Sequence, residues 1–262
     1  MTFVMSGNEN DIRDIWRAQQ ETLKQLLDTT DTSERICAQE TQPWRIGGVD
    51  ISFCKNSKEQ ACASLVIVEL PSMRMLYEAY RYVSIAFPYI PGFLAFRELP
   101  AFTELLNELM SRNPELRPDV LLVDGNGVLH PRGFGSACHL GIELQIPTIG
   151  VAKSFFHVDG LTKATVVERM RKQRKNILFL KGDSGRIWGA ACCFKSATNP
   201  VYVSVGHRVS LDTCIKVVEA SSLYRVPEPI RQADLRSRRV LRDWEAAGCV
   251  NTLLDRYLTY TE

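Results

Sequence analysis

The sequence predicts an α/β protein with a mixed sheet, in which three antiparallel strands are followed by two helix-linked parallel strands, flanked by helices. Apolar runs over 61–70 and 73–85 are separated by only two residues, as in an antiparallel meander. Short apolar runs over 119–125 and 147–154 enclose one helix-length segment, which implies a right-handed crossover and a parallel pair. The composition, 45% apolar and 24% charged, is ordinary for a soluble globular enzyme.

Hydrophobic periodicity assigns the first elements. Apolar residues at helical spacing predict an N-terminal helix over about 10–28. Residues 45–53 alternate between apolar and polar side chains as a strand does, and they join the two runs above to complete the antiparallel set. A helix is expected over 100–110, opening on Pro100, because proline suits the first turn of a helix.

The second half of the chain continues the alternation of strands and helices. A helix over 133–144 links the two parallel strands. We then expect a basic helix over 162–175, a hairpin of 177–180 with 187–194, a strand over 201–206, and a closing helix near 210–223. The sequence has no internal repeat, low-complexity tract or convincing linker, so residues 1–262 are predicted to form one domain.

Charge and cysteine usage exclude several classes of protein. With 32 basic and 30 acidic residues, an anionic partner would have to meet local clusters of Lys and Arg. The eight cysteines show no CxxC spacing, which argues against zinc and favours buried, reduced thiols. The sequence shows no signal-peptide pattern and no membrane-length apolar stretch, so we expect an intracellular protein, cytoplasmic, nuclear or both, nucleolar included, that does not contact a membrane.

Three acids fall where this topology would bring them together. Asp50 lies on the first strand, Glu98 just before the helix that opens at Pro100, and Asp124 at the carboxyl end of the fourth strand. Gathered carboxylates repel one another unless a hard cation holds them ionised, so their joint placement favours a metal site. Taken singly, each has a plain alternative: a solvent-facing strand residue, an acid near a helix N-terminus, or the first residue of a polar turn.

The turn after Asp124 is poor in side chains. Gly125 and Gly127 bracket an asparagine, and such glycines either permit a tight turn or let the backbone approach a planar ligand. The sequence lacks GxxxxGK[ST], GxGxxG and GxSxG, so familiar nucleotide cradles and a serine nucleophile elbow are absent. His130 and His139, taken alone, are most simply explained as structural histidines.

Six segments in the correct order resemble the endonuclease V family. Several of these segments, among them LLVDGNGVLHPRGFGSACHLG, are too long for chance agreement. They are residues 47–53, 88–100, 121–141, 148–154, 206–213 and 224–238, and together they span roughly residues 35–240.

This resemblance implies an RNase H-like fold and a metal-dependent phosphodiester hydrolase. It implies Mg²⁺, replaceable by Mn²⁺, and cleavage of the second phosphodiester bond 3′ to inosine, which leaves 3′-hydroxyl and 5′-phosphate ends. The matching metal-binding acids are Asp50, Glu98 and Asp124, and Asp234 matches a fourth site position that is Asp or His in the family; on sequence alone it suggests a surface helix cap. Lys153 matches a contact to the scissile phosphate, although a lysine at a strand end is otherwise explained by snorkelling. His130 matches a supporting position near that phosphate.

The family also has a wedge that replaces an extruded base. The matching segment is Tyr89, Ile90 and Pro91, stiffened by Pro88, although by itself it is only a proline-rich loop. An aromatic or apolar insert compensates for lost stacking. The resemblance makes Gly92 and Leu94 pocket residues, and it places the main-chain amides of Gly125 and Gly127 near the edge of hypoxanthine.

The expected partner is single-stranded RNA that contains inosine. The GNG turn, Cys138 and the basic segments 169–175 and 236–239 resemble the animal members, which prefer this substrate; the basic segments are equally explained as solvated helix faces. Two alternatives remain: an endonuclease for deoxyinosine in DNA, and a module that binds inosine RNA without cutting it. A monomer is expected.

Overall fold

The computed structural model describes residues 9–32, 43–55, 57, 59–85, 87, 89–195 and 197–246. In chain order, its elements are α1 (Glu9–Lys24), β1 (Trp44–Phe53), β2 (Gln60–Leu70), β3 (Met75–Ser84), α3 (Leu94–Arg112), a short 3-10 helix (Pro114–Leu116), β4 (Val120–Val123), α4 (Ser136–Leu144), β5 (Thr148–Ala152), α5 (Lys163–Gln173), β6 (Ile177–Lys181), β7 (Ile187–Cys192), β8 (Val201–His207), α6 (Leu211–Ala220) and α7 (Glu228–Ala246).

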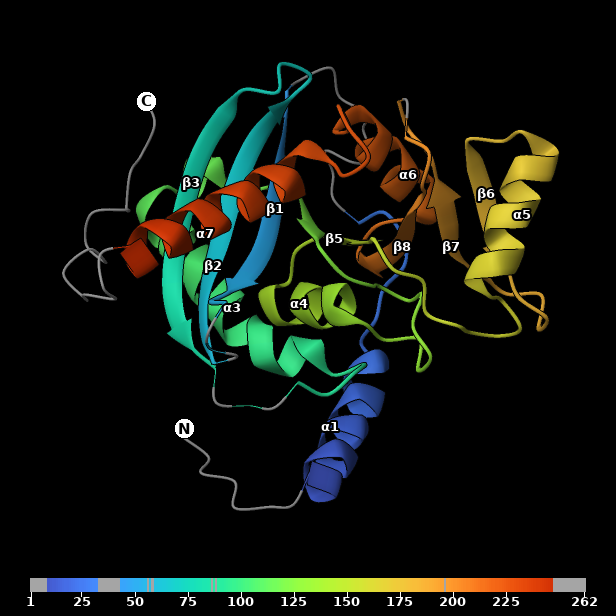
Figure 1. Cartoon of the computed structure of the whole chain (residues 1–262), viewed down its shortest axis with the longest axis horizontal. Coiled ribbons are helices and arrows are strands. Elements are labelled where there is room, and N and C mark those ends of the chain that lie inside the picture. Colours follow the sequence, from blue (N-terminus) through green and yellow to red (C-terminus); the bar gives the residue numbers. More distant parts are fainter. Residues whose placement is uncertain are drawn as a thin grey trace.

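One eight-stranded mixed sheet has the strand order β3-β2-β1-β4-β5-β8-β7-β6 (Figure 1). The expected antiparallel set is confirmed, since β2 pairs antiparallel with both β1 and β3. The expected parallel pair is confirmed as well, since β4 pairs with β5, and β4 is also parallel to β1. The carboxyl ends of β1, β4 and β5 therefore meet at one edge of the sheet.

Helices cover both faces of the sheet: α7 packs over β1 and β2 on one face, and on the other α3 packs over β2 and β3 while α4 packs over β5 and β8 (Figure 1). Side chains alternate along β1, so Val49 packs with Leu105 and Leu140 of α3 and α4, while Asp50 faces α7. On the α7 face, Val66 packs against Ala233. The fold therefore directs the acid of β1 toward the C-terminal helix and away from α3.

Two predicted helix starts are wrong. The helix expected to open at Pro100 begins at Leu94, so this proline lies inside α3. Packing overrides the proline preference here, because the ring of Phe96 stacks on Trp16 of α1 with centroids 4.7 Å apart. The helix expected from 133 begins at Ser136, because Gly133 has a φ of +67° and lies in the turn before it.

The expectation that a helix near 210–223 closes the fold is also wrong. A further helix, α7, follows α6 and packs across β1 and β2. Its buried residues, including Ala233, Ser237 and Val240, recur at helical spacing and face the sheet. Asp234 consequently lies within the helix rather than at its cap.

The cysteines match the prediction of reduced thiols. The six cysteines in the described ranges are free thiols and are buried, apart from the half-buried Cys193, while Cys37 and Cys249 lie outside those ranges. No helix among the described residues is long and apolar enough to cross a membrane.

Candidate active site

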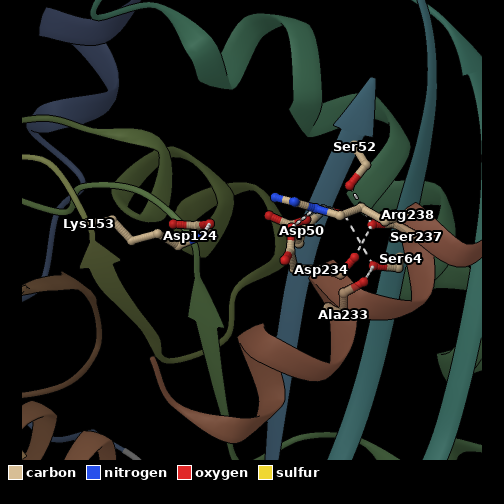
Figure 2. A network of polar contacts seen from close by, with 9 residues as sticks. All are labelled: Asp50, Ser52, Ser64, Asp124, Lys153, Ala233, Asp234, Ser237 and Arg238. Carbon is tan, nitrogen blue, oxygen red and sulfur yellow. Dashed lines mark hydrogen bonds and ion pairs between the residues drawn. The ribbon is translucent and has the colours of Figure 1, made fainter. Parts of the chain in front are cut away.

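Hydrogen bonds from serine side chains fix α7 against the first two strands. The hydroxyl of Ser64 on β2 donates to the carbonyls of Ala233 (2.8 Å) and Asp50 (3.3 Å). The hydroxyls of Ser52 and Ser237 are hydrogen-bonded to each other at 2.7 Å. This small polar seam sets the position of α7 and brings Asp234 beside Asp50 (Figure 2).

The parallel strands supply the next two groups. Asp124 directly follows β4 and Lys153 directly follows β5, and the register places Val123 opposite Gly150. Nζ of Lys153 lies 2.5 Å from Oδ2 of Asp124, a charge-assisted contact (Figure 2). The carboxylate at the end of β4 is therefore compensated in part by this lysine.

Four of the predicted site residues line one cavity of about 500 Å³: Asp50, Asp124, Asp234 and Lys153. They come from three strand ends and α7, so their proximity is produced by the tertiary fold. Glu98 does not line this cavity. It lies on α3, on the opposite face of the sheet from α7, and it interacts electrostatically with Asp124.

Burial and nearby negative charge make two of the acids, Asp50 and Glu98, hard to ionise. Burial raises the pKa of Asp50 well above its ordinary value, and the charges of Asp124 and Asp234 raise it further, against the opposing effect of Lys153. Burial also raises the pKa of Glu98 to about 7, with a smaller contribution from Asp124. Burial disfavours the charged form of Lys153, but the acids, Asp124 first, outweigh it and its pKa is raised.

The donor set suits a hard divalent cation. Oδ2 of Asp50 is buried and has no hydrogen-bond partner in the part of the chain that the structure describes. Within that same part, no three His, Cys, Asp or Glu side chains converge closely enough to hold a metal by themselves. Mg²⁺ is usually bound through one or two carboxylates and completes its shell with water and substrate phosphate. Asp50 and Asp124 fit that role, with Asp234 and Glu98 close to them.

A second, smaller cavity of about 40 Å³ lies at the turn after β4. It is lined by predicted pocket residues, Gly92, Leu94 and Gly125, and by His130. Sequence reasoning missed four other polar or aromatic lining residues: Gln20, Asn126, Ser136 and Phe156. Gln20 had a detectable signal, because it is a polar residue on the buried face of α1, where it is only 2% exposed.

His130 is a buried, neutral imidazole. Burial first, and the charge of Arg132 second, lower its pKa to about 4. Its Nδ1 accepts a hydrogen bond from the main-chain N–H of Arg132 (3.3 Å), and its ring meets Phe156 edge-on with centroids 5.5 Å apart. His130 therefore belongs to the small cavity, and as a neutral group it brings no positive charge to a phosphate.

The wedge segment is split between surface and core. Tyr89 is 62% exposed and Pro91 is exposed, whereas Ile90 is 2% exposed and packs with Trp16 and Phe93. Ile90 thus anchors the segment to α1 and leaves Tyr89 as the residue free to meet a substrate. Pro88 lies outside the described residues.

The expectation that the main-chain amide of Gly127 faces a base is not met. This amide donates to the hydroxyl of Ser204 at 3.0 Å. A Cβ at Gly127 would lie 1.9 Å from the carbonyl oxygen of Val205, so the glycine is needed for close packing of the turn against β8. Gly125 does line the small cavity, and a Cβ there would lie 2.3 Å from the hydroxyl of Ser136.

The family model for Endonuclease V matches residues 28–235, about four fifths of the chain. The chain belongs to the endonuclease V family. Human endonuclease V is 42% identical over 245 residues, which cover 90% of this chain and 86% of the human protein.

Solved endonuclease V structures share the fold. The catalytic domain of human endonuclease V superposes with a TM-score of 0.86 at 42% identity, covering 92% of this chain and 99% of that one. Endonuclease V of Ciona intestinalis, in complex with a 24mer DNA containing an inosine followed by a ribo-adenosine, gives a TM-score of 0.83 at 33% identity, covering 89% and 99%. The chain is thus a member of a nuclease family, and its matched region contains all the site residues predicted from the sequence, although not Gln20 of the small cavity.

Proposed function

We propose that this endonuclease V cleaves single-stranded RNA at the second phosphodiester bond 3′ to inosine, in a Mg²⁺-dependent reaction that leaves 3′-hydroxyl and 5′-phosphate ends. One observation carries the proposal: consecutive residues line the two cavities, Asp124 the acid-lined one and Gly125 the small one. A strand whose base enters the small cavity therefore has its backbone directed across the carboxylates.

The residues of the larger cavity have distinct tasks. Mg²⁺, when bound, would polarise the phosphate and lower the pKa of an attacking water. Asp50 and Asp124 would hold it, and a bound cation would oppose the raised pKa of Asp50 and keep that carboxylate ionised. Lys153, which lies 2.5 Å from Asp124, would contact the scissile phosphate as a point charge.

The small cavity supplies recognition of the base. Its volume of about 40 Å³ holds only about three water molecules, so a purine can enter only if lining side chains such as Leu94 and Phe156 move. The exposed ring of Tyr89 is suited to fill the gap left in the strand. Hypoxanthine differs from adenine in presenting O6 and N1–H, which Gln20 and Asn126 can hydrogen-bond.

The complex of the Ciona relative supports inosine as the recognised base. Its strand is DNA with one ribonucleotide after the inosine, and this composition gives weight to both RNA and deoxyinosine DNA as substrates. We propose RNA as the main substrate because the GNG turn, Cys138 and the basic segments 169–175 and 236–239 resemble the animal members. Cleavage of deoxyinosine DNA is the second candidate.

The decisive experiment compares four matched oligonucleotides, RNA and DNA, each with inosine or adenosine at one position, with Mg²⁺, Mn²⁺ or EDTA. Cutting of inosine RNA alone, in Mg²⁺ or Mn²⁺ only, is the expected result. Asp124→Asn should abolish the cut and spare binding. Faster cleavage of the DNA strand would favour the second candidate, and tight binding of inosine RNA without turnover in either metal would favour a binding module.

A further inference from the structure

One wall of the catalytic cavity is basic rather than acidic. Beside the carboxylates, the cavity is lined by Lys55, just beyond β1, and by Arg238 and Arg242 on α7. None of these three is used in the reaction proposed above. Each carries an exposed side chain, and all three face the space that Asp50 and Asp234 share.

The arginines extend a single stripe along α7. Asp234, Arg238 and Arg242 follow one another at four-residue intervals, so they lie on one helix face. Asp234 and Arg242 are separated by about 12 Å along the helix axis, given a rise of about 1.5 Å per residue. The stripe therefore leads from the catalytic acids outward along the cavity.

The members of this wall differ in how far their charge is already satisfied. Nε of Arg238 donates to Oδ1 of Asp234 at 2.7 Å, so this arginine is partly neutralised. Lys55 and Arg242 have no ion-pair partner among the described residues. The cavity also contains Glu245, but one of its carboxylate oxygens accepts the main-chain N–H of Lys55 at 3.2 Å. Two cations are thus left facing the outer end of the cavity.

We propose that Lys55 and Arg242 form a phosphate subsite that holds the flank of the single-stranded substrate, and this rests on the function proposed above. About 12 Å corresponds to three or four nucleotides of a stacked strand, at about 3.4 Å each. Phe53, 37% exposed, also lines the cavity, and the guanidinium of Arg97 lies over its ring, 4.8 Å from the centroid. Basic side chains interleaved with aromatic ones characterise grooves that bind single strands without sequence preference.

The family match covers only part of this wall. It ends at residue 235, so Asp234 and Lys55 lie inside the matched region and both arginines lie outside it. The subsite therefore combines a residue of the matched region with one beyond its end. If the subsite exists, the affinity for a single strand depends on the length of its flank. The acids and the small cavity alone do not produce this dependence.

Binding is measured by fluorescence anisotropy with a labelled inosine oligoribonucleotide, in an Asp124→Asn background so that no strand is cut. The test variant is Lys55→Gln combined with Arg242→Gln. The matched control is Lys216→Gln combined with Arg239→Gln, which removes the same charge from exposed positions outside the cavity. Two shorter oligonucleotides complete the set. One is shortened on the 5′ side of inosine and the other on the 3′ side, so that the shortened flank is too short to reach Arg242.

The test variant should bind the long strand more weakly, with a salt slope lower by about 1.4, since each lost contact to a single strand removes about 0.7. The ratio of the parent's binding constant to that of the test variant should then fall about sevenfold between roughly 50 and 200 mM salt. Shortening one of the two flanks should remove this difference, and the control should bind as the parent does. Equal salt slopes for the test and control variants would overturn the subsite. It would also be overturned if the difference between the test variant and the parent protein were the same on the long strand and on both shortened strands.

The proposed function has its own readout. If the unmodified protein fails to cut inosine RNA in Mg²⁺ and Mn²⁺, that function is wrong. The same salt slopes measured with an inosine-free oligoribonucleotide still decide the subsite, because phosphate contacts carry no base information.

Discussion

Gly48 on β1 sets the distance between the first strand and α7, and its replacement by alanine should damage the site without removing any of its chemical groups. A Cβ at position 48 would lie 2.3 Å from the carbonyl carbon of Pro229 and 2.7 Å from the main-chain nitrogen of Ile230. Ordinary contacts of a Cβ begin near 3.4 Å, so the start of α7 must move by about 1 Å. Backbone atoms cannot rotate away as a side chain can.

The displacement acts on catalysis through Asp234. This acid sits six residues into the displaced helix, beside Asp50 on the strand that carries Gly48. A misplacement of 1 Å can lower activity by about 100-fold, and overpacking costs about 1–3 kcal/mol of folding free energy. Out of a typical 5–15 kcal/mol, the variant keeps enough stability to fold. Gly48→Ala should therefore be folded and about 100-fold less active in kcat/KM on an inosine oligoribonucleotide.

Gly47→Ala is the matched control. Its Cβ would meet side-chain atoms, Cδ1 of Leu121 at 2.7 Å and Cβ of Pro118 at 3.2 Å, and α7 is not among its contacts. It should lose stability in urea denaturation but keep most of its activity. The reasoning fails if Gly48→Ala retains wild-type kcat/KM, or if the two variants lose activity in proportion to their loss of stability.

Three further predictions follow from other parts of the structure. Burial lowers the pKa of His139 to about 4 from an ordinary 6.5, so the folded state binds fewer protons than the unfolded one, and stability present above pH 6.5 is lost as pH falls toward 4. This loss amounts to about 2 kcal/mol at pH 5. In urea denaturation at pH 7 and pH 5, His139→Gln should therefore lose about 2 kcal/mol less unfolding free energy between the two pH values than the wild type does. Tyr89→Ala should lower kcat/KM by about 5- to 150-fold through about 1–3 kcal/mol of lost stacking, with an unchanged melting temperature because the ring is exposed; wild-type kcat/KM would remove the tyrosine from the wedge. Lys153→Gln should reduce kcat and also raise the pKa of Asp50, because the lysine now opposes that increase, so activity at a fixed Mg²⁺ concentration should begin to fall at a higher pH than in the wild type as pH is lowered; an unchanged acid limb of the pH profile would separate Lys153 from the acids.

The order of strands and helices could be predicted because it depends on the local spacing of apolar residues along the chain. Alternation over 45–53 and the short spacing after Leu70 predicted the antiparallel strands, and the strand–helix–strand order predicted the parallel pair of β4 and β5. The helix over 228–246 was missed, because its closely spaced charges obscure the apolar positions. The start of α3 was misplaced, because Pro100 is a local signal that packing on Trp16 overrides.

The sequence by itself determined which chemical groups the protein carries. Asp50, Asp124 and the glycine turn were recognisable from the type and order of residues, whereas Asp234 and Lys153 were assigned to the site only through the resemblance to the endonuclease V family. Only the tertiary structure decided which of them share a space. Parallel pairing of β1, β4 and β5 and the serine contacts to α7 gather the three aspartates, while Glu98 stays on the other face of the sheet. The physical reason is that burial, repulsion and hydrogen bonding between residues more than a hundred positions apart depend on how the strands and helices pack, and no local pattern records that packing.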